Sequence, residues 1–156
     1  MDARYINAFI SDVDQILGVM APDVHLIRQS PCMKQSPIIT NSIVVIIGIN
    51  GQVKGQVIFT FHMEWGLYLA GQMCCGTVFP VVDDMVLSAL GELSNMLSAR
   101  AITNIQKLTG EVADITPPTS LHSTGAVNIQ IATPIICIPY KNVVGNVFEI
   151  NFAIRR

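Results

Sequence analysis

The stretch VVDDMVLSALGELSNMLSARAITNIQKLT, residues 81–109, determines the architecture expected of this chain. Its apolar residues recur every three or four positions, a spacing that places them on one side of an α-helix. Gly110 follows directly, as glycine does at many helix C-termini. The side expected to face the core carries Val86, Leu90, Leu93, Leu97 and Leu108, with Ala101 beside them. The stretch therefore predicts one long helix packed on the rest of the fold.

The opposite side of this helix is narrow, small and polar. At about 100° per residue, Ser88, Glu92, Asn95 and Ala99 fall within a band of roughly 60°. Glu92 and Asn95 are one turn apart, so their side chains project side by side. A solvated helix face often carries such a pair without any function, but asparagine is a poor helix former because its amide competes for backbone hydrogen bonds. This stripe is the candidate functional site.

The remaining segments predict an α+β fold. Residues 2–20 show helical spacing of apolar residues, and residues 64–74 fit a shorter helix. β-Branched or alternating runs predict strands at 24–28, 42–49, 52–61, 126–138 and 143–154. Asn50-Gly51 predicts a tight hairpin turn, and residues 29–37, with two prolines, predict an irregular connection. This order of elements predicts helices packed on a mostly antiparallel sheet.

The composition indicates a single domain that spans no membrane. A chain of 156 residues suits one domain with one core, and no linker is evident, so we expect a single domain over 1–156. The longest strongly apolar stretch, 43–49, falls far short of the ~18 residues that a membrane-spanning helix needs. The first residues lack the pattern of a signal peptide. We therefore expect a cytoplasmic protein.

The balance of apolar and charged residues predicts a partner surface. The chain is 51% hydrophobic and only 13% charged, so it has few polar side chains with which to cover itself. An apolar interface with a second copy would solve this problem, and we predict a homodimer. The net charge is −2 and no basic run is present, which argues against a nucleic-acid partner.

The cysteines and histidines do not have the spacing of a metal site. Cys32, Cys74, Cys75 and Cys137 form no C-x-x-C pair, and the three histidines stand alone in the sequence. We predict reduced cysteines in or near the core and no metal bound by this chain. A metal site assembled from scattered cysteines and histidines is the alternative.

Two other groups of residues are predicted to be structural. Gly48, Gly51 and Gly55 lie in the hairpin and open no helix, so they do not form a phosphate-binding loop. Ser120, His122 and Ser123 are close in sequence but lack a nucleophile-elbow pattern, and we interpret them as loop residues.

The stripe on the long helix extends into a longer pattern. Ser88, three residues, Glu92, two residues, Asn95, twenty-two residues and Pro118 together resemble the signature of the CheC/CheX/FliY chemotaxis phosphatases. The flanking residues 89–95 and 115–118 and the opening residues 5–9 also agree, so the resemblance covers nearly the whole chain. Proteins of the CheC kind typically carry two such motifs, and residues 2–20 contain no second Glu-x-x-Asn. The single motif favours the CheX branch.

The resemblance implies a CheC-like fold whose long helix carries the motif. It also implies a phosphatase that hydrolyses the aspartyl phosphate of a CheY-like receiver. Asn95 would position an in-line water, Glu92 would engage the receiver, and Ser88, Ala99 and Pro118 would lie on the partner-binding surface. No cofactor would be bound by this chain, because the Mg²⁺ would be held by the receiver. The resemblance further implies a dimer formed by strand exchange.

A non-catalytic function is the alternative. The chain would keep the fold and the receiver-facing helix but act as an adaptor or scaffold. The single motif motivates this alternative, as does the changed position at Ala99, since Ser98-Ala99 stands where the family often has a glycine after the asparagine.

Overall fold

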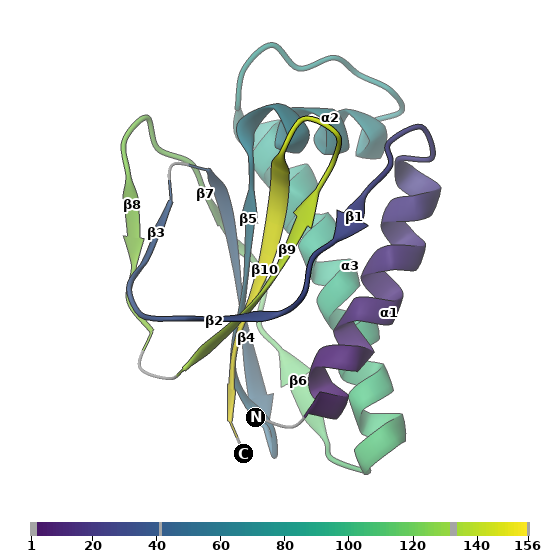
Figure 1. Ribbon diagram of the computed structural model, residues 1–156, viewed down its shortest axis with the longest axis vertical. Helices are drawn as coiled ribbons and strands as arrows, with labels where there is room; N and C mark the ends of the chain where they lie inside the picture. Colours follow the sequence, from purple (N-terminus) through teal and green to yellow (C-terminus); the bar gives the residue numbers. More distant parts are fainter. Residues whose placement is uncertain (1–2, 41, 132–133, 156) are drawn as a thin grey trace.

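In the computed structural model, residues 3–40, 42–131 and 134–155 are described. Within these ranges, three helices pack against a mostly antiparallel sheet, and a small second sheet lies beyond it (Figure 1). The helices are α1 (Ala3–Met20), α2 (Met63–Met73) and α3 (Asp84–Thr109). Helix α3 runs alongside α1, and α2 crosses one end of the molecule (Figure 1). The α+β architecture expected from the sequence is confirmed.

The main sheet has the order β1-β9-β10-β5-β4-β6, with β2 also paired to β9 and β7 also paired to β4. Its strands are β1 (Ile27–Arg28), β2 (Cys32–Lys34), β4 (Ile43–Gly51), β5 (Lys54–Phe61), β6 (Ala113–Ile115), β7 (Thr119–Leu121), β9 (Ile135–Lys141) and β10 (Asn146–Arg155). The second sheet pairs β3 (Ile38–Thr40) with β8 (Val127–Ile129). The described strand pairs are all antiparallel.

The central strands are buried on both faces. Val45, Ile47 and Phe59 belong to the large core between the sheet and the helices. Val44 and Ile58 point the other way, into a smaller cluster that β3 and β8 cover. Burial on both faces explains why residues 43–47 are apolar without interruption, where a strand exposed on one face would alternate.

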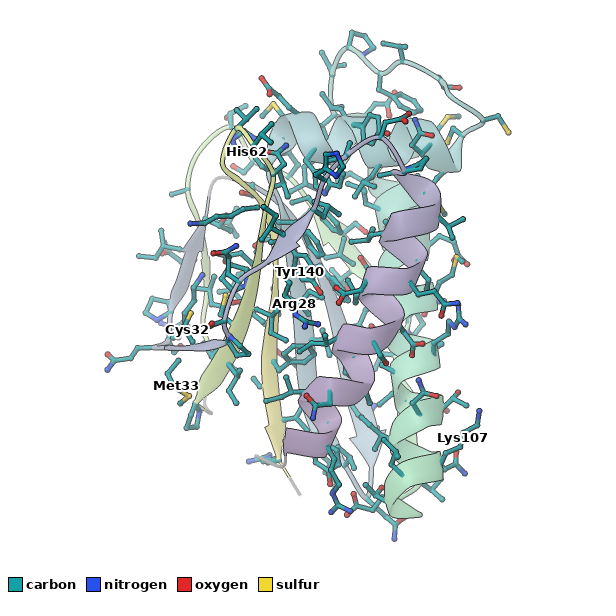
Figure 2. The ribbon with its side chains drawn as sticks, turned by 45° about the vertical axis from the view of Figure 1, so that its right-hand side comes forward. Arg28, Cys32, Met33, His62, Lys107 and Tyr140 are labelled. Carbon is teal, nitrogen blue, oxygen red and sulfur yellow. The ribbon has the colours of Figure 1, made fainter. Side chains whose placement is uncertain are left out.

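A polar chain of contacts ties α1 to the sheet. The Tyr140 hydroxyl donates a hydrogen bond to Asp14 at 2.9 Å, and Arg28 forms an ion pair with the same carboxylate at 2.8 Å. Figure 2 shows Tyr140 and Arg28 in the region between the sheet and α1. Burial raises the pKa of Tyr140, and the negative charge of Asp14 raises it further, so the hydroxyl keeps the proton that it donates.

Helix α3 is capped at both ends. Its N-cap residue, Asp83, accepts a hydrogen bond from the Val86 backbone at 2.9 Å, and Lys107 lies in its last turn (Figure 2). Gly110 ends the helix with φ 75°, as its position in the sequence predicted. The helix begins at Asp84 rather than at residue 81, because Asp83 provides the cap.

The prediction that Leu108 faces the core is wrong, since its side chain is 59% exposed. Toward the C-terminus of α3 the buried side of the helix shifts to Ile102 and Ile105. A straight helix that crosses a twisted sheet presents a gradually changing side to it. Counting 100° per residue from Val86 therefore no longer predicts which side chains are buried at the position of Leu108.

The hairpin between β4 and β5 is present, but the predicted Asn50-Gly51 turn is wrong. Strand β4 continues through both residues because β6 pairs with them, Asn50 opposite Asp114 and Gly51 opposite Ala113. Gly51 has φ 126°, while Asn50 lacks the positive φ that a tight turn of this type needs. The chain reverses only after Gly51 and rejoins the sheet at Lys54.

Three other predicted segments differ from the structure. The predicted strand 126–138 is two strands, β8 and β9, which belong to different sheets; residues 132 and 133 lie outside the described residues. The connection 29–37 contains β2, which is ordered by pairing with β9. The predicted strand 24–28 is reduced to Ile27–Arg28. In each case the difference comes from a pairing partner distant in sequence.

Gly55 provides a test of the sheet packing. Its φ is 147°, and a Cβ added there would lie 2.1 Å from the carbonyl oxygen of Ala153 on β10. We expect Gly55→Ala to lower the free energy of unfolding by at least about 2 kcal/mol, because it adds both backbone strain and a clash with main chain. Chemical denaturation measures this change. Gly125→Ala is the control, since no heavy atom beyond its chain neighbours lies within 4 Å of the added Cβ. Equal stabilities of the two variants would contradict the prediction.

Candidate functional site

The candidate site lies on the outer side of α3. Ser88, Glu92 and Ala99 are exposed, and Asn95 is half-buried. Leu90 and Leu93, on either side of Glu92 in the sequence, are fully buried. Because these leucines are held in the core, the helix cannot rotate, and Glu92 must project outward.

The two polar side chains of the site form no polar contact with the described part of the protein. Within the described ranges, neither Glu92 nor Asn95 has a hydrogen-bond or ion-pair partner. The amide atoms of Asn95 are not among the buried side-chain atoms that lack a partner, so the amide remains open to solvent. Both side chains are therefore available to a second molecule.

A contact at Gly91 holds α3 beside β7 and Pro118. A Cβ added at Gly91 would lie 2.8 Å from the Ser120 Oγ and 3.5 Å from the Pro118 Cγ. Ser120 belongs to β7 and pairs with Val45 of β4, so the interpretation of Ser120 as a loop residue is wrong. Gly91 and Asn95 are four residues apart and lie on the same side of α3. The contact thus places Pro118 along the edge of the stripe that carries Asn95.

Of the three residues at this contact, the sequence pattern indicates Pro118 as part of the site but not Gly91 or Ser120. Glycine lowers the stability of a helix interior by about 1 kcal/mol relative to alanine, so a glycine inside a long helical pattern indicates close packing at that point. That signal was present at Gly91. Nothing local marked Ser120, which reaches the helix only because β7 pairs with β4.

Small buried residues continue this packing surface. Ser94 and Ser98 are 0% exposed, and their hydroxyl oxygens have no hydrogen-bond partner among the described residues. Both occupy the buried side of α3, where a larger side chain would push the helix away from its neighbours. The stripe is therefore carried by a helix that is held closely against the sheet.

The cysteines are only partly in the core. Cys137 is buried and Cys74 is half-buried, but Cys32 and Cys75 are exposed, contrary to the expectation. Cys32 lies on the short edge strand β2, and Cys75 lies in the turn after α2 with φ 57°. In the part of the chain that the structure describes, no group of three or more histidine, cysteine, aspartate or glutamate side chains gathers where a metal ion could be held.

A small polar cluster surrounds Cys137 on the sheet face away from the helices. Lys34 forms an ion pair with Glu149 at 2.5 Å. Burial raises the pKa of the Cys137 thiol to about 12, and the charge of Glu149 adds to this effect while Lys34 opposes it. At neutral pH Cys137 is a protonated thiol and hence a poor nucleophile.

The Nδ1 of His122 is buried without a partner among the described residues.

The arrangement on α3 suits contact with another macromolecule. An exposed glutamate and a free amide stand side by side on a rigid helix. They do not enclose a small substrate, but they can enter a pocket that belongs to another molecule. Among the described residues, no helix is long and apolar enough to cross a membrane.

Comparison with known proteins identifies close relatives. A family profile described as "Chemotaxis phosphatase CheX" matches residues 43–141. The CheY-P phosphatase CheX of Thermotoga maritima is 34% identical over 123 residues, which is 76% of each chain.

Solved structures share the fold. A CheC-like superfamily protein from Shewanella sp. PV-4 superposes with a TM-score of 0.85 at 23% identity and covers 100% of both chains. The CheX–CheY–BeF₃–Mg²⁺ complex from Borrelia burgdorferi gives a TM-score of 0.80 at 24% identity and covers 97% of this chain and 98% of that one. The CheC-like fold implied by the sequence resemblance is confirmed.

The environment of Cys137 predicts its reactivity. We expect iodoacetamide at pH 8 to modify the exposed Cys32 and Cys75 within minutes, and to leave Cys137 unmodified because its thiol is buried and protonated. Peptide mass mapping over time measures each site. The same reaction in denaturant is the control and should modify all four cysteines. Alkylation of Cys137 in the folded protein as fast as that of Cys32 would refute the assignment.

Proposed function

The chain belongs to the CheX family of chemotaxis phosphatases, and from this membership we propose that it hydrolyses the aspartyl phosphate of a CheY-like receiver. The observation that carries the assignment of the site is the pair Glu92 and Asn95, which stand together on α3 without partners among the described residues. The relative from Thermotoga maritima is named for action on phosphorylated CheY, and the Borrelia burgdorferi protein of this fold was solved in complex with CheY.

Asn95 is proposed to position the attacking water. An aspartyl phosphate is an activated mixed anhydride, so hydrolysis needs a water molecule held in line with the bond that breaks more than it needs a strong base. The Asn95 carboxamide can donate to and accept from one water molecule. The water oxygen bonds to phosphorus, the bond from phosphorus to the aspartyl oxygen breaks, and its electron pair returns to the carboxylate. Inorganic phosphate leaves as H₂PO₄⁻, which carries both protons of the water.

Glu92 is proposed to bind the receiver rather than the phosphoryl group. Its carboxylate would repel the phosphoryl oxygens, since like charges at contact distance cost several kcal/mol at a protein surface. A cationic side chain of the receiver, such as a lysine, is the complementary partner. Glu92 would then orient the receiver so that Asn95 reaches the water. Ser88 and Ala99 are small enough to let the two surfaces approach, and Pro118 lies along the same edge of the stripe.

The Mg²⁺ that phosphoryl transfer requires is proposed to belong to the receiver. The stripe on α3 supplies one carboxylate, whereas a Mg²⁺ site uses several oxygen ligands. We propose that this chain binds no cofactor of its own and that it contributes two side chains to a site completed by its partner.

We also propose that the protein is a homodimer in the cytoplasm. Ile27, Met33 and Ile39 are 55%, 68% and 66% exposed, and they lie on the short strands β1, β2 and β3. Figure 2 shows Met33 and Cys32 on the side of the sheet away from α1 and α3. Exposed apolar residues on short edge strands are suited to pairing with a second copy.

The catalytic assignment predicts different effects for the two motif residues. With a phosphorylated receiver and Mg²⁺, we expect Asn95→Ala to lower kcat at least 100-fold while the receiver still binds. Glu92→Lys should mainly raise KM, because it reverses the charge that faces the receiver. Phosphate release, measured against a panel of receivers from the same genome, tests both variants.

An unchanged kcat in Asn95→Ala would overturn the role of Asn95. If the wild-type chain bound a receiver but did not speed its dephosphorylation, the adaptor function would replace the proposed one.

The dimer proposal predicts a solution mass of about twice 17.0 kDa. Light scattering during size-exclusion chromatography measures it at micromolar concentration. Met33→Lys, which places a charge on the proposed interface, should shift the protein toward the monomer. A monomeric wild-type protein would show that these strands do not pair with a second copy.

A further inference from the structure

Two exposed methionines lie on the same side of α3 as the candidate catalytic pair. Met85 is 58% exposed and Met96 is 41% exposed. At about 100° per residue, both fall within roughly 40° of Glu92, on the side away from Asn95. Met96 is one turn after Glu92, and Met85 is two turns before it. Glu92 therefore has Asn95 on one flank and the methionines on the other.

These side chains are large where the rest of the stripe is small. Ser88 and Ala99 rise little above the backbone, whereas a methionine side chain reaches three atoms beyond Cβ, as far as a glutamate side chain does. A surface that approaches closely enough to touch both Glu92 and Asn95 must also meet Met96. In the isolated chain the two methionines expose apolar area to water, which is unfavourable in proportion to that area.

We propose that Met85 and Met96 form an apolar docking surface for the receiver, and that they bind an apolar patch beside its phosphorylation pocket. This inference rests on the proposed function and names the part of the site that supplies affinity. The occupant is the receiver rather than a second copy of this chain, because a copy seated on the methionines would also cover Glu92 and Asn95. The apolar residues of β1, β2 and β3 lie on different elements.

The chemistry of methionine fits this role. Its side chain is unbranched and polarizable, so it adapts to partner surfaces of different shape. Glu92 is the one charged residue among Met85, Ser88, Glu92, Asn95, Met96 and Ala99. The contribution of the two methionines is apolar, so increasing ionic strength should weaken it little, whereas salt should screen the contribution of Glu92.

The test compares Met96→Lys and Met85→Lys with the wild-type chain. The probe is the receiver that the wild type dephosphorylates fastest, assayed with Mg²⁺ for phosphate release and as its beryllofluoride adduct for affinity by calorimetry. We expect each lysine variant to raise KM and the dissociation constant at least tenfold, with kcat within about twofold of wild type. Met96→Leu should stay within about threefold of wild type in both constants, because it keeps an apolar side chain of similar volume.

Leu108→Lys is the matched control. Leu108 is 59% exposed on the same helix but points away from the stripe, so this variant should leave KM and affinity unchanged. Thermal unfolding verifies that all four variants are folded.

Each outcome decides the proposal. If the wild type is active and Met96→Lys keeps its KM and affinity, the docking surface is refuted while the proposed function stands. A loss in Met96→Leu as large as in Met96→Lys also refutes apolar docking, as does a change in dimer mass caused by Met96→Lys. If the wild type binds the adduct without speeding hydrolysis, the phosphatase function fails, and weaker binding by Met96→Lys still supports the docking surface. If the wild type neither binds nor dephosphorylates any receiver, both proposals fall.

Discussion

The close packing of α3 against the sheet is the contact on which the rest of the site depends. Gly91 leaves room for Ser120 and Pro118, and Ser94 and Ser98 keep the buried side of the helix small. Leu90 and Leu93 anchor the helix in the core and prevent its rotation. Glu92 and Asn95 consequently point outward from a rigid support, with no hydrogen bonds inside the described structure to hold them.

This arrangement separates stability from function. The free energy of folding comes from the apolar core, to which Glu92 contributes nothing, so substitutions in the stripe should alter activity with little effect on stability. The proposed phosphatase function needs no deep cavity, because the substrate is itself a folded protein, which we propose also brings the metal. The chain has to offer two polar side chains at a fixed spacing and a surface that docks beside them.

The sheet explains the composition of the chain. Three helices cover one face of the central strands, and β3 and β8 cover part of the other, so β4 and β5 are buried on both sides (Figure 1). Burial on both sides requires apolar residues on both faces of each central strand, and this requirement accounts for much of the 51% hydrophobic content. The exposed apolar residues include those on the short strands β1, β2 and β3 and those around Glu92 on α3. We propose that a second copy of the chain covers the residues on the strands and that the receiver covers those on α3.

The sequence by itself determined the elements whose patterns are local. The long helix, its end at Gly110, the central strands and the neighbouring placement of Glu92 and Asn95 all follow from spacing within one segment. Only the tertiary structure decided features that depend on a distant partner. Strand β6 extends β4 through Asn50 and Gly51, and residues 126–138 divide between two sheets. The shift of the buried side of α3 exposes Leu108, and the pairing of β7 with β4 brings Ser120 to Gly91. Periodicity shows which side of a helix or strand is apolar, but it does not show which distant segment of the chain packs against that side.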